Sequence, residues 1–302
     1  MSRLLKFTFR NAPVRGELVR LTDAWREMTA QHDYPPVVKR LLGEMVAAAT
    51  LLATTIKFNG KLVMQVDGDG PVQLLVVDCQ PDLAVRATAK LRDEPIPDDL
   101  PMRELVNRTG RGRFAITLDP SEPLPGQQPY QGIVSLDGNS MSEILETYMR
   151  QSEQLETRLW LASNDDVASG LLLQRLPEDG GHGGPGSDAD AWPRAVTLAQ
   201  TITPAELIEL TPDDVMRRLF WQEALQYFPP LEPRFACNCS RERIGRMLES
   251  LGKEEVDSIV VEQGSVTVTC DFCNRQYAFD AVDVAQLFAR GGTLGADDTT
   301  RH

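Results

Sequence analysis

Four of the five cysteines of this chain lie in one window near its C-terminal end, as two closely spaced pairs. Cys237 and Cys239 form a C-x-C pair, and after thirty intervening residues Cys270 and Cys273 form a C-x-x-C pair. Each pair brings two sulfur atoms close enough to share one ion, and four thiolates at about 2.3 Å are a common ligand set for Zn²⁺. None of the chain's three histidines lies in this window. The spacing therefore predicts one Zn²⁺ per chain, held by four thiolates in the reduced state.

The same spacing leaves two interpretations of this site open. Closed four-ligand zinc sites are most often structural, which would make the window a zinc-stapled domain without chemistry. However, a C-x-C pair closes into a disulfide only through a tight ring, and strained disulfides are easily reduced. C-x-x-C is also the spacing of dithiol redox motifs. The four sulfurs can thus form a zinc site when reduced and two local disulfides when oxidised, and spacing permits this switch without establishing it.

Composition and the N-terminal residues indicate the cellular compartment. The hydrophobic content of 42% and charged content of 25% are those of a globular protein. The first residues lead into an alternating, strand-like run instead of an apolar signal segment, and the longest apolar stretch, residues 45–56, is too short to span a bilayer. We therefore expect a cytoplasmic protein with no membrane partner. In that compartment paired cysteines bind metal or sense redox state more often than they form structural disulfides.

The net charge argues against a polyanionic partner. The chain carries 31 Lys and Arg against 44 Asp and Glu, a formal net charge of −13. Residues 232–290 contain seven basic and ten acidic side chains, so the cysteine window has no basic excess of its own. A zinc ribbon that grips nucleic acid normally presents a basic face. We expect no nucleic-acid partner.

Residues 1–176 are predicted to form a large α+β domain, because strands and helices alternate irregularly and the strands close in hairpins. Pro35-Pro36 introduces a long helix over residues 37–57, apolar on most of its circumference, which should be the buried spine of the domain. Thr22 is a candidate N-cap for a short helix, and Ser140 and Glu143 fit a capping box for another. A further short helix is predicted over 101–106, and strands are predicted over 4–9, 14–21, 61–66, 71–77, 83–89, 113–118, 132–136, 157–162 and 168–174. Cys79, which has no partner in sequence, is expected to be a buried small apolar side chain.

Residues 177–231 are predicted to be a flexible connector followed by a helical linker. The glycine-rich stretch 177–193 is typical of a solvated connector, whereas the pattern from 194 to 227 is helical. Thr203 and Thr211 each precede a proline, as N-caps do when proline occupies the first helical position. Helices this short are marginal alone and need a neighbour to pack on. The linker should therefore be ordered only while something holds it down.

Residues 232–290 are predicted to be a small zinc domain, followed by a disordered tail at 291–302. Helices are expected over 244–251 and 256–264, a strand over 266–269, and a last helix capped by Asp280. The window contains few large apolar side chains, so a metal would supply much of its folding energy. Loss of zinc should loosen this domain and the linker helices that lean on it.

Beyond the cysteines, the chain resembles the redox-regulated bacterial heat-shock holdases, the 33 kDa chaperonin family. The C-x-C and C-x-x-C quartet in this order, with Cys239-Ser-Arg-Glu-Arg243 at its start, is specific to that family. The resemblance spans nearly the whole chain and includes the stretches 41–49, 68–71, 74–78, 129–134, 150–154, 157–161 and 170–177.

This resemblance implies an ATP-independent chaperone, not an enzyme, that zinc holds inactive. It implies that Cys237, Cys239, Cys270 and Cys273 are the zinc ligands of the reduced state. It also implies that oxidants form the Cys237–Cys239 and Cys270–Cys273 disulfides, expel zinc and unfold the linker. The uncovered apolar surface would then bind proteins that unfold under heat or oxidative stress, and the activated form would be a homodimer. The apolar faces of residues 203–228, with whatever they cover on the first domain, are the expected client surface.

Two other functions remain as alternatives. A thiol–disulfide oxidoreductase would turn over small disulfides, but Cys270-Asp-Phe-Cys273 does not open a helix after a strand in a βαβ unit, as the thioredoxin arrangement requires. A zinc-ribbon adaptor for nucleic acid or protein would keep its site closed under peroxide, and salt-dependent binding to nucleic acid is disfavoured by the acidic charge.

Overall fold

The computed structural model describes residues 1–302 except 11, 57, 124–125, 178–187, 189 and 292–302. The chain divides into two compact units, Met1–Ala236 and Cys237–His302, which are described separately below. Residues 178–187 and 189 of the predicted flexible connector, and residues 292–302 of the predicted disordered tail, lie outside the described residues. The ends of both predictions were wrong, because residues 191–193 begin a helix, Ala191–Ala199, and residue 291 ends another, Ala281–Gly291. The proposed boundaries at 176, 231 and 290 stay predictions.

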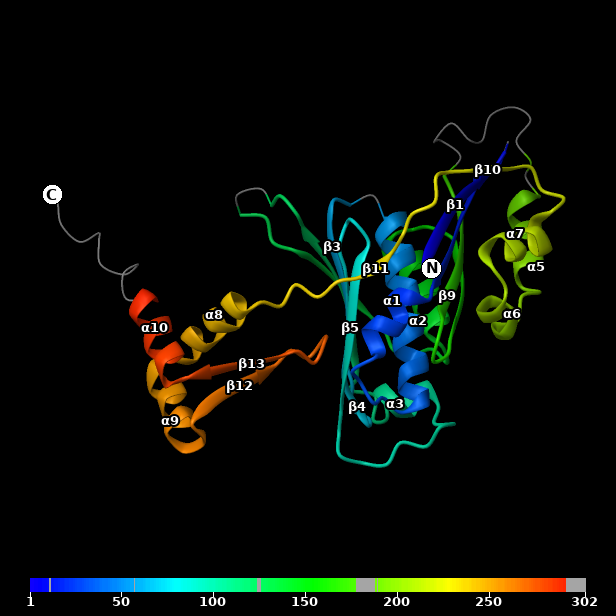
Figure 1. Ribbon diagram of the computed structural model, residues 1–302. Helices are drawn as coiled ribbons and strands as arrows, with labels where there is room; N and C mark the ends of the chain where they lie inside the picture. Colours follow the sequence, from blue (N-terminus) through cyan, green and yellow to red (C-terminus); the bar gives the residue numbers. More distant parts are fainter. Residues whose placement is uncertain (11, 57, 124–125, 178–187, 189, 292–302) are drawn as a thin grey trace. The chain divides into compact units, whose positions relative to one another are not determined.

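The first unit contains two β-sheets. One has the order β10-β1-β2-β9-β8, and we call it sheet A; the other, sheet B, has the order β11-β5-β4-β3-β6-β7 (Figure 1). All neighbours are antiparallel except β11 and β5, which are parallel. The strands of sheet A are β1 (Arg3–Phe9), β2 (Val14–Leu21), β8 (Thr157–Ser163), β9 (Ala168–Arg175) and β10 (Leu225–Tyr227). Those of sheet B are β3 (Gly60–Asp67), β4 (Val72–Cys79), β5 (Ala84–Leu91), β6 (Arg113–Pro120), β7 (Tyr130–Val134) and β11 (Arg234–Phe235).

Helix α2 (Pro36–Thr55) is the buried spine of this unit, as predicted. It contacts strands of both sheets and therefore lies between them (Figure 1). Leu42, Met45 and Leu52 are fully buried in the core that it shares with the two sheets. Helices α3 (Met102–Val106) and α4 (Met141–Ser152) complete this core, and both the α+β class and these helix positions are confirmed.

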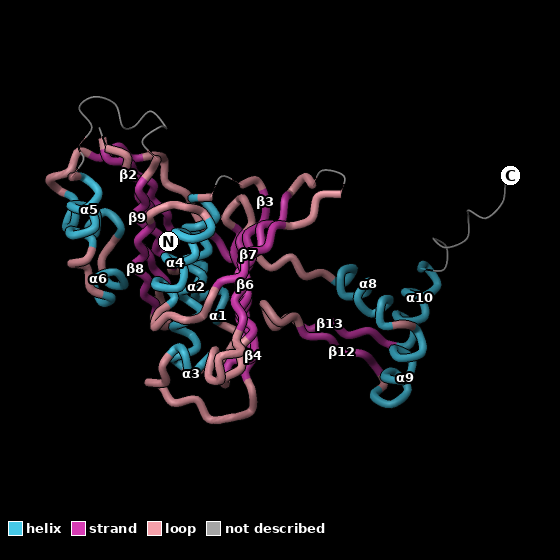
Figure 2. Tube along the Cα trace, turned by 180° about the vertical axis from the view of Figure 1, so that it is seen from behind, coloured by secondary structure: helices cyan, strands magenta, loops and turns pink. Residues whose placement is uncertain are grey.

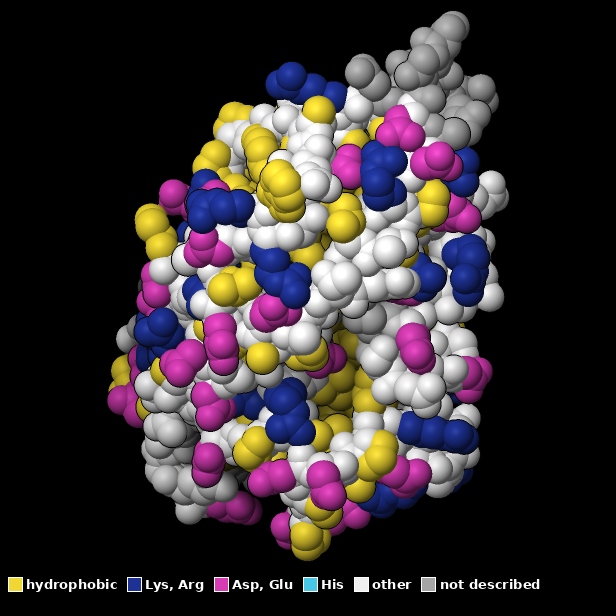
Figure 3. Space-filling model, turned by 90° about the vertical axis from the view of Figure 1, so that its right-hand side faces the viewer, with side chains coloured by type: hydrophobic (Ala, Val, Ile, Leu, Met, Phe, Trp, Pro, Cys, Tyr) yellow, Lys and Arg dark blue, Asp and Glu magenta, His cyan; other side chains and the backbone are white. Residues whose placement is uncertain are grey.

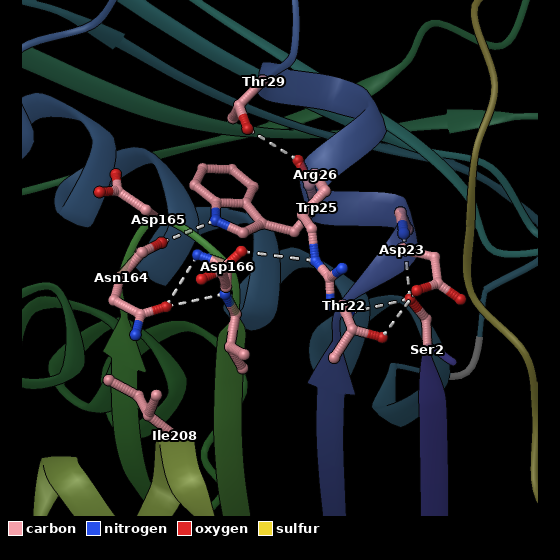
Figure 4. Close-up of polar contacts among 12 residues, drawn as sticks. Ser2, Thr22, Asp23, Trp25, Arg26, Thr29, Asn164, Asp165, Asp166 and Ile208 are labelled. Carbon is pink, nitrogen blue, oxygen red and sulfur yellow. Dashed lines mark hydrogen bonds and ion pairs between the residues drawn. The ribbon is translucent and has the colours of Figure 1, made fainter.

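The short helix α1 (Asp23–Thr29) forms where it was predicted, but its cap differs from the prediction. Thr22 makes no side-chain capping bond, because its own backbone is already near helical. Instead Ser2 Oγ accepts hydrogen bonds from the amides of Thr22 at 3.1 Å and Ala24 at 3.2 Å (Figure 4). The Trp25 indole donates to the carbonyl of Asn164 at 2.8 Å, which ties α1 to the β8–β9 turn (Figure 4).

The capping box predicted at α4 is only half formed. Ser140 Oγ accepts from the amide of Glu143 at 3.3 Å, as the box requires. The carboxylate of Glu143, however, accepts from the amide of Asn139 at 2.8 Å and not from that of Ser140.

Three linker helices cover the face of sheet A that points away from α2. They are α5 (Ala191–Ala199), α6 (Pro204–Glu209) and α7 (Pro212–Phe220). Their apolar side chains are buried in a second cluster with those of β1, β2, β8 and β9. Thr203 forms a full capping box with Glu206, and Thr211 caps α7, so both predicted caps are confirmed. On the outer surface of this layer, acidic and basic side chains alternate around a hollow lined by hydrophobic groups (Figure 3).

The end of the linker adds an edge strand to sheet A, and the residues that follow it add one to sheet B; neither strand was predicted. Residues 225–227 were expected to be helical but form β10 beside β1, because Phe7, Thr8 and Phe9 offer them an open strand edge. Residues 228–231, which we call the strap, continue along β1: the amide of Phe228 donates to the carbonyl of Lys6 at 3.0 Å, and Leu4 and Leu231 bridge. The chain then reaches sheet B as β11, paired with Ala84 and Val85 of β5.

The second unit is a hairpin with three helices (Figure 2). Its elements are α8 (Arg241–Leu251), α9 (Lys253–Gln263), β12 (Ser265–Thr269), β13 (Gln276–Asp280) and α10 (Ala281–Gly291). The predicted helices and β12 are confirmed, and Asp280 Oδ1 caps α10 by accepting from the amide of Asp283 at 2.8 Å. Strand β13 was not predicted. Within the described residues of the whole chain, no helix is both long and apolar enough to cross a membrane.

Candidate metal centre

The first cysteine pair lies in the extended segment that leads into α8. Cys237 opens the second unit and Cys239 directly precedes Ser240, the N-cap of α8. Ser240 Oγ accepts from the amide of Arg243 at 3.2 Å. Because the cap fixes the start of the helix, it also fixes the direction in which the C-x-C segment enters.

The second pair occupies the turn between β12 and β13. The amide of Cys270 donates to the carbonyl of Arg275 at 3.0 Å, and the amide of Asn274 donates to the carbonyl of Cys270 at 2.9 Å. Asn274 has a φ of +53°, a left-handed conformation that asparagine tolerates better than most residues. This tight turn folds Cys273 back beside Cys270, so the hairpin presents both sulfurs at one end.

The structure brings the four predicted cysteines together. Their sulfur atoms all lie within 4.8 Å of one another, with 3.6 Å between Cys237 and Cys270 and 3.4 Å between Cys239 and Cys273. Four sulfurs at about 2.3 Å from one ion would stand roughly 3.8 Å apart at the corners of a tetrahedron. The sulfurs of a disulfide would be only about 2.05 Å apart. The spacing thus fits four separate thiolates around a small divalent ion, and all four thiols are free.

The surroundings of Cys239 favour its thiolate. Burial raises the pKa of this thiol, but a hydrogen bond from Tyr277 Oη at 3.2 Å and the contacts with the other cysteines outweigh burial and lower the pKa to about 7. Burial is the main cause that raises the pKa of Cys237, and it is the first of the causes that raise the pKa of Cys273 to about 12. Since the thiolate is the form that binds metal, the hydrogen bond from Tyr277 favours the metal-binding form of Cys239.

Tyr277 is the site residue that the sequence interpretation missed. It lies on β13, opposite Val268 of β12. Apolar residues occupy every second position on both sides of the C-x-x-C turn, Val266 and Val268 before it and Tyr277 and Phe279 after it. This pattern is typical of a hairpin and could have indicated the position of Tyr277.

Cys79 is not part of the cluster. It ends β4 in the first unit and is fully buried there, as expected. Burial, with the nearby carboxylates of Asp78 and Asp82, raises the pKa of its thiol to about 12. A thiol in this state reacts poorly with oxidants.

The apolar core that supports the cluster is small. Only five hydrophobic side chains of the described residues are fully buried in it, namely Leu248, Val256, Val266, Phe279 and Val284. Arg241 stacks over the ring of Phe279 at 4.2 Å and forms an ion pair with Asp283 at 2.7 Å, linking the start of α8 to β13 and α10. A core of this size gives little stability by itself, so bonds to a metal would carry much of the fold.

The chain is similar to known proteins over almost its full length. A model of the family described as Hsp33 protein matches residues 2–280. The 33 kDa chaperonin of Methylobacillus flagellatus is 44% identical over 300 residues, covering 99% of this chain and 98% of the relative. The 33 kDa chaperonin of Chromobacterium violaceum is 46% identical over 286 residues, covering 95% and 93%. The crystal structure of the 33 kDa chaperonin from Thermotoga maritima has the same fold, with a TM-score of 0.77 at 20% identity over 96% of this chain and 99% of that one.

Proposed function

The chain belongs to the Hsp33 family of 33 kDa chaperonins, and from this membership we propose how its four cysteines switch it on. It is a redox-regulated holdase with a C-terminal four-cysteine site, and it is a chaperone and not an enzyme. The finer steps of the switch, set out below, are our proposal.

In the reduced state, we propose, Cys237, Cys239, Cys270 and Cys273 hold one Zn²⁺ per chain. The observation that carries this proposal is the group of four sulfurs within 4.8 Å of one another, offered by two separate segments of the second unit. Bound zinc would hold the C-x-C segment against the β12–β13 turn and stabilise a unit whose own core is small.

Oxidation then closes each pair on itself, as Cys237–Cys239 and Cys270–Cys273. Each disulfide forms when one thiolate attacks peroxide and the resulting sulfenic acid condenses with its neighbour, releasing two water molecules per peroxide. Two peroxides therefore consume all four thiols and leave no thiolate for a metal. The short distance along the chain within each pair supports this pairing.

We propose that oxidation of the four cysteines and loss of zinc release the linker. Cys237 lies two residues after β11, and the amide of the intervening Ala236 donates to the carbonyl of Val85 at 3.2 Å, which holds the chain that follows the linker on sheet B. The linker helices are too short to persist alone and stay folded through their contacts with sheet A. Once the second unit loosens, their apolar faces and the face of sheet A that they cover become the surface for unfolding client proteins.

We further propose that the activated chain is a homodimer and acts in the cytoplasm. Family membership supports both inferences.

Peptide mapping under non-reducing conditions tests the proposal. Reduced protein should contain one zinc per chain and four free thiols in the second unit. After peroxide treatment, the map should contain only the two local disulfides. The oxidised protein should also have lost its zinc, and it should sediment as a dimer. A disulfide between the two pairs, such as Cys239–Cys273, would contradict the proposed mechanism.

A further inference from the structure

Beneath the strap lies a pocket that the chaperone cycle described above does not use. It has a volume of about 750 Å³ and lies within the first unit. Its apolar wall consists of Phe7 on β1, Leu176 and Pro177 after β9, and Phe228, Pro229 and Leu231 of the strap. A volume of several hundred cubic ångströms with a mostly apolar wall is typical of small-molecule sites.

The polar end of this pocket is a built cluster of charges. Glu17 has only 1% of its side chain exposed, and its Oε1 lies 3.0 Å from Lys6 Nζ. No donor within the described residues is aligned for a hydrogen bond to that oxygen, whereas Oε2 accepts from the hydroxyl of Thr54. Lys6 and Arg15 also donate to the carbonyls of Thr54 at 2.7 Å and Thr55 at 2.8 Å, which end helix α2. The ion pair with Lys6 and the hydrogen bond from Thr54 offset the cost of burying this carboxylate at the polar end of the pocket.

The charge balance at this end favours an anion. Among the described residues, Lys6, Arg15 and Glu17 are the charged groups that line the pocket, two cations against one carboxylate. The donors of Arg15 that are in use are Nε and Nη2, which bond Gln174 and Thr55, so Nη1 has no acceptor among the described residues. An incoming carboxylate can therefore bond Arg15 Nη1 and Lys6 Nζ without displacing their present partners.

The backbone around the pocket is already paired, which excludes an added strand. The edge of β1 is occupied by β10 and the strap, through Phe228 and Leu231. A client peptide that binds by strand addition needs free backbone groups. The pocket thus suits a compact ligand with one polar head.

We propose that this pocket binds a small amphiphilic carboxylate, of the class of a medium-chain fatty acid, with its head at Lys6 and Arg15 and its chain along the apolar wall. Because three residues of that wall belong to the strap, the ligand binds only while the linker is docked. At a ligand concentration of 100 Kd, the population with a released linker falls about 100-fold. The coupling between ligand binding and the docked linker rests on the proposed function, whereas the binding of the ligand does not.

Calorimetric titration of decanoate into the reduced, zinc-loaded full chain tests the binding. We expect one saturable site, with decanol and decyltrimethylammonium bound at least tenfold more weakly. Thr8→Phe fills the pocket without removing a charge and should weaken decanoate at least tenfold. Glu17→Gln removes the repelling carboxylate and should tighten binding at least threefold, while Glu209→Gln, an exposed change on α6, should leave it unaltered.

Four results would overturn the binding proposal: no binding of decanoate, equal binding of the cationic amphiphile, an unchanged affinity in Glu17→Gln, or binding of an apolar client peptide in place of decanoate. If Thr8→Phe fails to fold, the affinity of Glu17→Gln for decanoate alone tests whether the ligand binds in this pocket. The coupling is tested by peroxide activation at saturating decanoate, which should be slowed; unchanged kinetics with intact binding would refute the coupling. Failure of the proposed function would appear separately, as ligand-free protein that peroxide does not activate.

Discussion

Replacing Phe220 by alanine should release the linker without any oxidant. Phe220 ends α7 and is 2% exposed. Its ring packs edge-on against Phe9 at 5.5 Å and lies 5.8 Å from Phe7, so it is a main contact between linker and sheet A. Truncation of a buried phenylalanine costs about 3–5 kcal/mol. Since each 1.4 kcal/mol is tenfold, the docking equilibrium should shift by roughly two to three and a half orders of magnitude.

Two assays on reduced, zinc-loaded protein measure this shift. Hydrogen exchange followed by mass spectrometry should be faster at the amides of α6 and α7 by about two orders of magnitude or more. The same protein should suppress aggregation of a thermally unfolding client without peroxide. Trp221→Ala is the matched control, because this neighbouring side chain is 72% exposed and its loss should change stability by no more than about 0.5 kcal/mol.

The two assays distinguish what orders the linker from what binds the client. If α7 in Phe220→Ala exchanges as slowly as in the wild type, packing on sheet A is not what orders the linker. If exchange is fast but the reduced protein still fails to protect the client, uncovering this surface is insufficient for client binding.

Three further predictions follow from particular residues. Thr203→Ala removes the capping box of α6 and should destabilise that helix by about 1 kcal/mol, seen as faster amide exchange confined to the linker; slower or unchanged exchange would contradict it. Chelation of zinc from the reduced protein should remove exchange protection from β12, β13 and the linker helices, while the buried helix α2 keeps its protection. A still-protected hairpin would show that the core of the second unit suffices without metal. Burial raises the pKa of Glu44 on α2 to about 7, so between about pH 4.5 and 7 the folded chain keeps a proton that the unfolded chain has lost, and stability falls as pH rises through this window. Glu44→Gln should therefore stabilise the first unit by up to about 3 kcal/mol at pH 8 and hardly at pH 5 in denaturant unfolding, whereas exposed Glu27→Gln should do neither.

The features that could be predicted from sequence are those with a local signature. The cysteines come as two short-range pairs, so each half of the cluster is visible without knowledge of the fold. Helix α2 has an apolar pattern twenty residues long, and Thr203 and Thr211 cap helices within their own next three residues. Such patterns depend only on neighbours along the chain.

The features that were missed depend on partners far away in sequence. Strands β10 and β11 have three and two residues, too few to show an alternating pattern, and form because β1 and β5 offer them free edges. Ser2 caps a helix that begins twenty-one residues later, which no local rule indicates. Glu17 looks like an ordinary outward residue of a strand until the end of α2 and Lys6 enclose it.

The most direct test of the redox switch follows zinc release and chaperone activity in the same samples. A chromogenic chelator would report zinc while peroxide is added at a mildly elevated temperature, and light scattering would report aggregation of a thermally unfolding client. The account predicts that zinc release and suppression of aggregation rise together, and that a dithiol reductant with added zinc reverses both. Equal suppression by reduced and oxidised protein would contradict it, because the four cysteines would then be a structural staple and not a switch.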